Sequence, residues 1–161
     1  MLKIQKINLS HIPHCLDSLS NDLKEFQYFQ DLGWSKKQLI NQINKKHNYS
    51  LGLWQSNILI AYLIGELIYV EKKSEYEILL LYVDKNFRNQ GHATFLINAL
   101  ISSLKSKKLS KITLEVPKSN YIAINLYRKN YFFQIGKRKD YYKNKITIKE
   151  DALIFEKKIN E

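Results

Sequence analysis

The feature that most constrains the fold is the apolar run Ile58–Val70, which reads ILIAYLIGELIYV. The run is too long and too apolar for a surface strand, so it predicts a strand at the centre of a β-sheet. Gly65 and Glu66 interrupt it far short of the roughly 20 apolar residues that a membrane-spanning helix needs. We therefore expect a sheet-based core and no transmembrane helix.

Changes in hydrophobic period on either side of this run predict the other elements. We expect a first helix that Ser10 caps and that carries Leu23 on its inner face. The 161 residues contain no repeat or linker and match the usual domain size of about 100–200 residues, so we expect one domain spanning 1–161. The expected strands are 3–8, 49–54, 58–70, 76–83, 111–116, about 131–139 and about 152–158, with helices from 10, at 35–46, at 91–107 and from about 120. This order predicts a mixed α/β sheet that is antiparallel in its first half, with one parallel crossover at the helix 91–107.

The formal net charge of +11 does not by itself indicate nucleic-acid binding. The basic residues are 23 Lys and 3 Arg, although Arg is the better bidentate ligand for phosphate. Lys, Asn, Ile and Tyr, whose codons are rich in A and T, make up 68 residues, against 15 for Gly, Ala, Pro and Arg. Biased composition therefore accounts for most of the charge, and we expect no stable nucleic-acid binding.

The remaining composition predicts a cytoplasmic protein without a membrane or metal partner. The single cysteine, Cys15, allows no internal disulfide and provides no zinc-site spacing. No continuous apolar segment follows Lys3 and Lys6, so no signal peptide is evident.

One candidate ligand-binding segment lies where the strand that ends at Val83 turns into the next helix. Gly91 lacks a Cβ, so a ligand can approach the backbone closely, and Arg88 adds a charged donor. The free amides of a first helical turn carry the positive end of the helix dipole and suit a pyrophosphate. An ordinary strand–turn–helix junction would look similar, so this motif alone leaves both interpretations open.

The other segment is LEVPKSNYIAINLYRKNYF, with Glu115 at the end of a strand and Asn120 and Tyr127 on the helix that follows. Taken singly, these residues have ordinary structural interpretations: a solvated strand residue, a helix N-cap and a core tyrosine.

Together and in this order, the two segments resemble the GCN5-related N-acetyltransferase (GNAT) superfamily, and within it the ribosomal-protein-alanine N-acetyltransferases of the RimI type. The R-x-x-G-x-A motif is typical of the whole superfamily, whereas LEV-x-x-SN-x-x-A-x-x-LY, followed by R-x-x-YY and EDA, is more specific to the RimI-like branch. His92 and Tyr131 depart from the pattern, which usually has an aliphatic residue and a glycine at these positions. The resemblance covers most of the chain, through Gly33-Trp34-Ser35, VDKNFRNQGHATFLI, LEVPKSNYIAINLY, RKDYY and EDALIF.

The resemblance implies a GNAT fold, in which two central strands of a mixed, mostly antiparallel sheet splay apart between flanking helices. It implies acetyl-CoA as co-substrate and no metal, with Glu115 accepting the proton of the substrate amine and Tyr127 donating one to the departing thiolate. The implied coenzyme contacts are Leu81, Tyr82, Val83, Arg88, Asn89, Gln90, Gly91, His92, Ala93, Thr94 and Asn120. The implied substrate contacts are Trp34, Arg138, Tyr141 and Tyr142, although Trp34 and the tyrosines also fit purely structural roles.

The leading hypothesis is therefore acetyl transfer to the α-amino group of a protein N-terminus, with a ribosomal protein as the expected partner. A lysine side chain or a small amine is the alternative acceptor. A non-catalytic RNA- or ribosome-binding module is the alternative of a different class.

Overall fold

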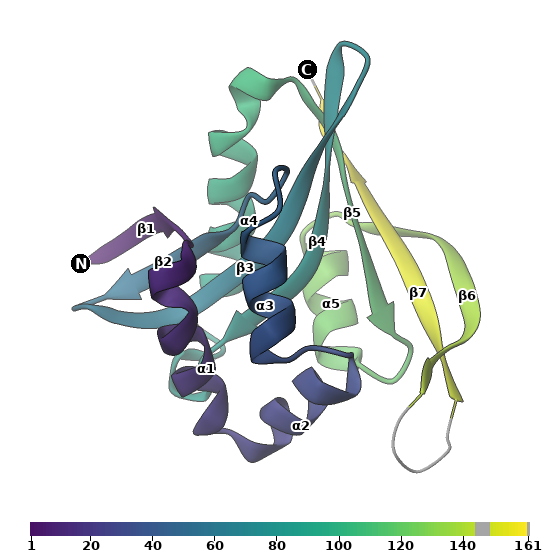
Figure 1. Ribbon diagram of the computed structural model, residues 1–161. Helices are drawn as coiled ribbons and strands as arrows, with labels where there is room; N and C mark the ends of the chain where they lie inside the picture. Colours follow the sequence, from purple (N-terminus) through teal and green to yellow (C-terminus); the bar gives the residue numbers. More distant parts are fainter. Residues whose placement is uncertain (144–148, 161) are drawn as a thin grey trace.

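Seven strands form one sheet in the order β1-β2-β3-β4-β5-β7-β6 in the computed structural model, which describes residues 1–143 and 149–160 (Figure 1). Every neighbouring pair is antiparallel except β4 and β5. The predicted mixed sheet with one parallel crossover is confirmed. The elements are β1 (Leu2–Lys6), α1 (Ile12–Ser20), α2 (Leu23–Asp31), α3 (Lys36–Ile43), β2 (Leu51–Gln55), β3 (Ile58–Val70), β4 (Lys73–Val83), α4 (His92–Ser103), β5 (Leu109–Pro117), α5 (Tyr121–Lys129), β6 (Phe133–Lys143) and β7 (Lys149–Lys158), with short 3-10 turns at 9–11, 85–87 and 105–107.

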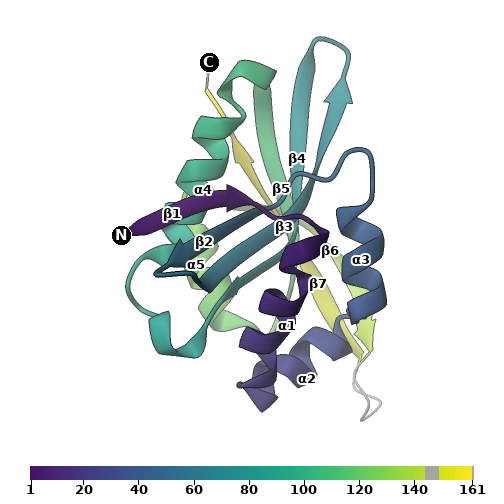
Figure 2. The ribbon, with the colours of Figure 1, turned by 60° about the vertical axis from the view of Figure 1, so that its left-hand side comes forward.

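Helices cover both faces of the sheet (Figure 2). On one face, α1 and α3 pack on a cluster that includes Tyr62 and Ile64 of β3. On the other face, α4 and α5 pack on a cluster that includes Ala61 and Leu63 of the same strand. The central position predicted for β3 is confirmed, because this stretch of the strand is buried from both sides.

A β-bulge in β4 creates the main irregularity of the sheet. Ile64 pairs with Leu80 and Gly65 pairs with Ile78, so Leu79 is the extra residue of β4. A bulge reverses which face the following side chains point to. Accordingly, Ile78 belongs to the cluster under α4 and α5, whereas Leu80 belongs to the cluster under α1 and α3.

The bulge also marks the point where β4 and β5 separate. Their parallel pairing runs from Ser74 opposite Leu109 to Ile78 opposite Leu114 and ends there, although both strands continue. From Leu80 to Val83, β4 pairs with β3 alone. This is the splay that the resemblance implied.

The sequence prediction was wrong about the helices at the N-terminus. Ser10 lies in a 3-10 turn that Asn8 caps, and α1 ends at Ser20. Leu23 does not lie on the inner face of this helix, since it is 81% exposed and begins the separate helix α2. The cause is Asp22, which adopts an extended conformation and caps α2 by accepting a hydrogen bond from the Glu25 amide.

The turn before β6 contains one of the departures from the family pattern. Tyr131 has φ of 64°, the left-handed conformation that glycine adopts most easily. Here a tyrosine adopts that conformation, and β6 begins at Phe133 rather than at the predicted residue 131. In the described part of the chain, no helix is long and apolar enough to cross a membrane.

Candidate active site

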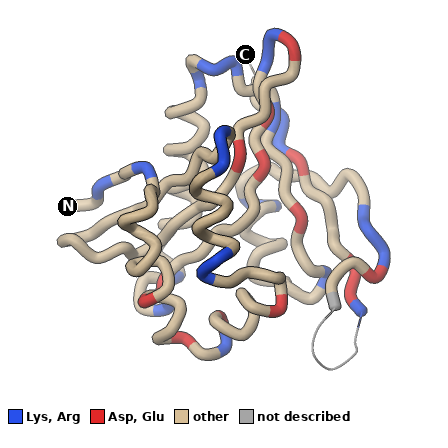
Figure 3. Tube along the Cα trace, viewed as in Figure 1, with Lys and Arg blue, Asp and Glu red and all other residues tan. Residues whose placement is uncertain are grey.

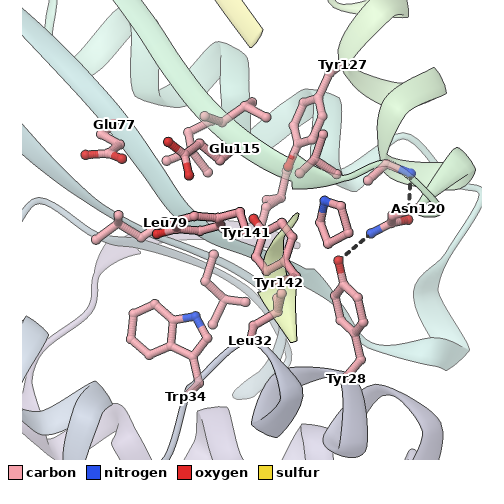
Figure 4. A pocket seen from close by; sticks show the side chains of 17 residues that line it. Tyr28, Leu32, Trp34, Glu77, Leu79, Glu115, Asn120, Tyr127, Tyr141 and Tyr142 are labelled. Carbon is pink, nitrogen blue, oxygen red and sulfur yellow. Dashed lines mark hydrogen bonds between the residues drawn. The ribbon is translucent and has the colours of Figure 1, made fainter. Parts of the chain in front are cut away.

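A cavity of about 270 Å³ opens where β4 and β5 separate (Figure 4). Its walls come from the second half of β4, the end of β5, the start of α5, α2 with the residues that follow it, and β6. Segments far apart in the sequence therefore meet at this one point. The lining residues used below are Tyr28, Leu32, Trp34, Glu77, Leu79, Leu81, Glu115, Asn120, Tyr127, Tyr141 and Tyr142.

Glu115 lies on β5, one residue beyond the last pair with β4. Its side chain is 19% exposed, and its Oε1 accepts a 2.8 Å ion-pair contact from Nε of Arg138 on β6. The Arg138 guanidinium also lies over the ring of Tyr141, 5.2 Å from its centroid. The sequence placed both Glu115 and Arg138 at the site, and the structure brings them into direct contact.

Tyr127 reaches the cavity from the second half of α5, with its ring packed against Phe132 and Phe155. Burial, with a smaller contribution from Tyr28, raises the pKa of the Tyr127 phenol. The hydroxyl therefore stays protonated at neutral pH, which is the state that a proton donor needs.

Asn120 combines its two possible roles. Its Oδ1 accepts a hydrogen bond from the Ala123 amide and so caps α5, as the sequence predicted. Its Nδ2 donates to the Tyr28 hydroxyl on α2 at 2.9 Å (Figure 4). The bond from α5 to α2 closes one side of the cavity.

The remaining predicted substrate residues also line the cavity. Trp34 lies half-buried behind α2 and stacks on Phe29, with centroids 6.2 Å apart. Tyr141 and Tyr142 meet edge to face at 5.1 Å on β6. Trp34 thus serves as a structural anchor while it faces the cavity.

The turn into α4 has the features expected of an anion-binding helix start. Gly91 is the N-cap with φ of 80°, and no side chain caps the helix. A Cβ at this glycine would meet no atom within 4 Å, so the space above the turn is open. Asn89 also has a positive φ, of 60°, so successive backbone units turn sharply just before α4. Asn89, Gln90, Gly91, His92, Ala93 and Thr94 supply this turn and the first helical residues.

Three of the predicted coenzyme-binding residues have side chains that make contacts within the protein. Arg88 donates to the Val83 carbonyl at 3.0 Å and pairs with Asp22 at 3.2 Å, so it ties the turn to the start of α2. Tyr82 points to the opposite face of the sheet, where its hydroxyl donates to a carbonyl of α1. The His92 ring lies beside Phe87, inside the turn.

A model of the acetyltransferase (GNAT) family matches residues 16–132, which is well over half of the sequence. The chain belongs to the GNAT family.

Several proteins are similar to this GNAT chain. It is 36% identical over 121 residues to the ribosomal protein bS18-alanine N-acetyltransferase of Haemophilus ducreyi, an alignment that covers 75% of this chain and 80% of that protein. The crystal structure of the ribosomal-protein-S18-alanine N-acetyltransferase from Escherichia coli superposes with a TM-score of 0.78 at 23% identity, covering 100% of this chain and 96% of that chain. Arabidopsis thaliana NAA60 in complex with acetyl-CoA gives a TM-score of 0.77 at 19% identity, with both chains covered in full.

Membership of the GNAT family identifies this chain as an acetyl-CoA-dependent acetyltransferase, rather than the non-catalytic RNA-binding module that the sequence had left open. The fold comparisons show that the chain shares its overall fold with these solved structures.

Two residues of this GNAT cavity were missed by the sequence interpretation. Tyr28 belongs to α2, the helix that was not predicted, so nothing indicated that it would meet Asn120. Glu77 lies within a strand of alternating burial, where an acidic residue looks like an ordinary solvated position. Its proximity to Glu115 depends on the parallel pairing of β4 and β5, which no local pattern specifies.

Proposed function

We propose that the protein transfers the acetyl group of acetyl-CoA to the α-amino group of a protein N-terminus, with a ribosomal protein as the substrate. The observation that carries this proposal is the convergence of Glu115, from β5, and Tyr127, from α5, on the cavity between the splayed strands. The first can accept a proton from an attacking amine, and the second can donate one to a leaving thiolate.

The splay supports a specific path for the coenzyme. Beyond Ile78, one side of β4 has no partner strand, so the amide groups of a pantetheine arm can add to it like a further strand. The uncapped start of α4 suits the pyrophosphate, with Asn120 available from α5. Arg88 acts in this scheme through the turn that it holds to α2, and its guanidinium reaches a phosphate only by leaving Asp22.

The reaction needs no covalent enzyme intermediate. The amine nitrogen attacks the thioester carbonyl, the new C–N bond forms as the C–S bond breaks, and the thiolate takes its proton from Tyr127. Glu115 accepts the proton that the nitrogen loses, directly or through a water molecule. An α-amino group has a pKa of about 8, so such an acceptor is needed at neutral pH.

The choice of an N-terminal amine rests on the relatives and agrees with the lining of the cavity. The Haemophilus ducreyi relative is named for an alanine N-terminus of ribosomal protein bS18. In this chain, Trp34, Tyr141 and Tyr142 offer aromatic faces and hydroxyl groups around the opening, and these suit an extended peptide backbone.

Thiol release from acetyl-CoA with a panel of lysine-free peptides tests the proposal. Peptides that begin with Ala should be turned over, and the same peptides with a blocked N-terminus should not. If no Ala-, Ser- or Met-initiated peptide is acetylated, N-terminal acetylation is excluded. Turnover only when an internal lysine is restored would assign the lysine-acetylating alternative.

A further inference from the structure

A hydrogen bond between α2 and α5 lies at one side of the cavity. The Tyr28 hydroxyl on α2 accepts this bond at 2.9 Å from Nδ2 of Asn120, the N-cap residue of α5. Both side chains line the cavity, and Figure 4 shows them away from the end that holds Glu77 and Glu115. The bond therefore connects a helix outside the recognised motifs to a residue that the motifs assign to the coenzyme.

The bond fixes the orientation of the Asn120 side chain. Its Oδ1 accepts from the Ala123 amide, so the NH₂ end of the side chain is the end that meets Tyr28. An NH₂ group has two hydrogens, and Tyr28 takes one of them. The other hydrogen bonds to no residue that the structure describes, and it suits a carbonyl oxygen of a ligand in the cavity.

The Tyr28 phenol stays neutral over the whole physiological range. Burial raises the pKa of Tyr28 to about 12, although the bond from Asn120 opposes the rise. The charges of Glu25 and Glu150 add to the increase. The contact with Asn120 is therefore a bond between two neutral groups, and its strength should not change between about pH 7 and pH 9.

Polar contacts at the start of α2 help to place Tyr28. Within α2, Phe29 provides the buried apolar contact. Asp22, the N-cap of α2, pairs with Arg88 at 3.2 Å, and Nζ of Lys85 donates to the backbone carbonyl just before Asp22 at 2.6 Å. Both partners belong to the segment between β4 and α4. This short helix is thus attached to the turn before α4 at its start and to α5 through Tyr28.

We propose that Tyr28 is a positioning residue for the coenzyme, which orients the Asn120 amide toward the pantetheine arm of acetyl-CoA and so gives α2 a share in coenzyme binding. The inference rests on the proposed contact between Asn120 and the coenzyme. The pantetheine arm contains amide carbonyl groups, which accept the kind of N–H that Asn120 has left. Without the Tyr28 oxygen, the amide is held by the bond to Ala123 alone.

The test is calorimetric titration of coenzyme A into wild type and Tyr28→Phe, which keeps the ring and removes the hydroxyl. The dissociation constant should rise about two- to tenfold, the effect of losing one hydrogen bond, by the same factor at about pH 7 and pH 9. ADP has a pyrophosphate but no pantetheine arm, so it should bind both proteins equally. An unchanged affinity for coenzyme A would overturn the role of Tyr28. An equal loss of affinity for ADP would also overturn it, because the change would then act through the turn before α4.

Asn120→Ser tests whether Tyr28 acts through Asn120. Serine has a hydroxyl that can cap α5 but no amide that can reach Tyr28. The single variant should weaken the binding of coenzyme A, and adding Tyr28→Phe should cause no further loss. Losses that multiply in the double variant would overturn the proposal. Unchanged binding in Asn120→Ser would instead overturn the proposed contact of Asn120 with the coenzyme, and the role of Tyr28 with it.

Tyr62→Phe is the matched control for the loss of a tyrosine hydroxyl. The Tyr62 hydroxyl also joins a helix to another element, since it donates to the Cys15 carbonyl of α1 at 3.3 Å, but Tyr62 is not part of the cavity lining. The dissociation constant of coenzyme A should therefore equal that of wild type in this variant.

Discussion

At the residue scale, the cavity brings carboxylates and a phenol together from different elements. Glu77 and Glu115 extend from adjacent strands, whereas Tyr127 extends from α5. The sequence motif indicated Glu115, Tyr127 and Asn120, because each lies within one continuous segment. Glu77 could not be found in this way, since its place beside Glu115 depends on a strand pairing between distant parts of the chain.

The Tyr127 hydroxyl can be removed without disturbing the core. It makes no hydrogen bond with any described residue, while the ring packs on Phe132 and Phe155. Tyr127→Phe should therefore lower kcat by about 100-fold, the lower end of the range for proton-transfer catalysis, with little change in KM or Tm. Steady-state kinetics and thermal melting measure these effects.

Tyr121→Phe is the control for this prediction, since Tyr121 lies on the same helix and is 72% exposed. An unchanged kcat in Tyr127→Phe would remove the proposed proton donor.

Arg138 should set the acidic limit of activity. Its charge lowers the pKa of Glu77, so Arg138→Gln should raise that pKa. Because the ionised Glu77 carboxylate attracts an ammonium group into the cavity, kcat/KM should then fall at a higher pH as the solution is acidified. The measurement is kcat/KM between about pH 5 and pH 8, with the exposed Arg128→Gln on α5 as control. If the acidic limb of the kcat/KM profile stays in place or moves to lower pH in Arg138→Gln, the effect of Arg138 on this pKa is contradicted.

At the element scale, hydrophobic period predicted most strands and helices because each has a clear buried face. The exception was α2, a short helix with only Phe29 buried, which begins through the Asp22 cap rather than through a long apolar stripe. The bulge at Leu79 could not be predicted either, because local sequence does not specify which residue of a strand is left unpaired. The splay was expected only through the resemblance to a family, and the shape of the cavity depends on it.

Gly65 is required opposite the bulge. A Cβ at this position would overlap the Tyr76 hydroxyl and the Glu77 carbonyl oxygen. Gly65→Ala should therefore lower the free energy of unfolding by roughly 1–3 kcal/mol, as over-packing usually does, and should reduce kcat/KM by shifting β4 where it lines the cavity. Chemical denaturation and peptide kinetics test both effects.

Gly136→Ala provides the comparison, because its added Cβ would come no closer than 3.7 Å to Ile154. It should stay within about 1 kcal/mol of wild type. Equal stability of the two variants would show that the bulge tolerates a side chain.

At the scale of the whole molecule, the net charge of +11 and the charges of the cavity have opposite effects on a basic substrate. Figure 3 shows Lys and Arg spread over most elements, and Asp and Glu both on the central strands and around the helices near the N-terminus. Near the cavity, three carboxylates face two cations: Glu66, Glu77 and Glu115 face Lys45 and Arg138. The long-range field therefore repels a basic protein, and the short-range field attracts its N-terminal ammonium.

Added salt should weaken the long-range repulsion more than the short-range attraction. Raising ionic strength from about 0.01 M to about 0.1 M shortens the screening length from about 30 Å to about 10 Å, which weakens the long-range repulsion most. The kcat/KM of an Ala-initiated peptide with a Lys- and Arg-rich tail should rise roughly two- to fivefold over this range. A peptide with a neutral tail should change less. A fall for the basic peptide would show that its tail binds local acidic groups.

Locating the acetyl group on the product tests the central claim most directly. The wild-type enzyme is incubated with acetyl-CoA and an Ala-initiated peptide that also contains an internal lysine, and the product is fragmented in a mass spectrometer. We predict that the added acetyl mass appears in every fragment that contains the N-terminal alanine and in no fragment that contains the lysine alone. Acetylation confined to the lysine, or an unmodified peptide, would contradict transfer to an N-terminal α-amino group in this cavity.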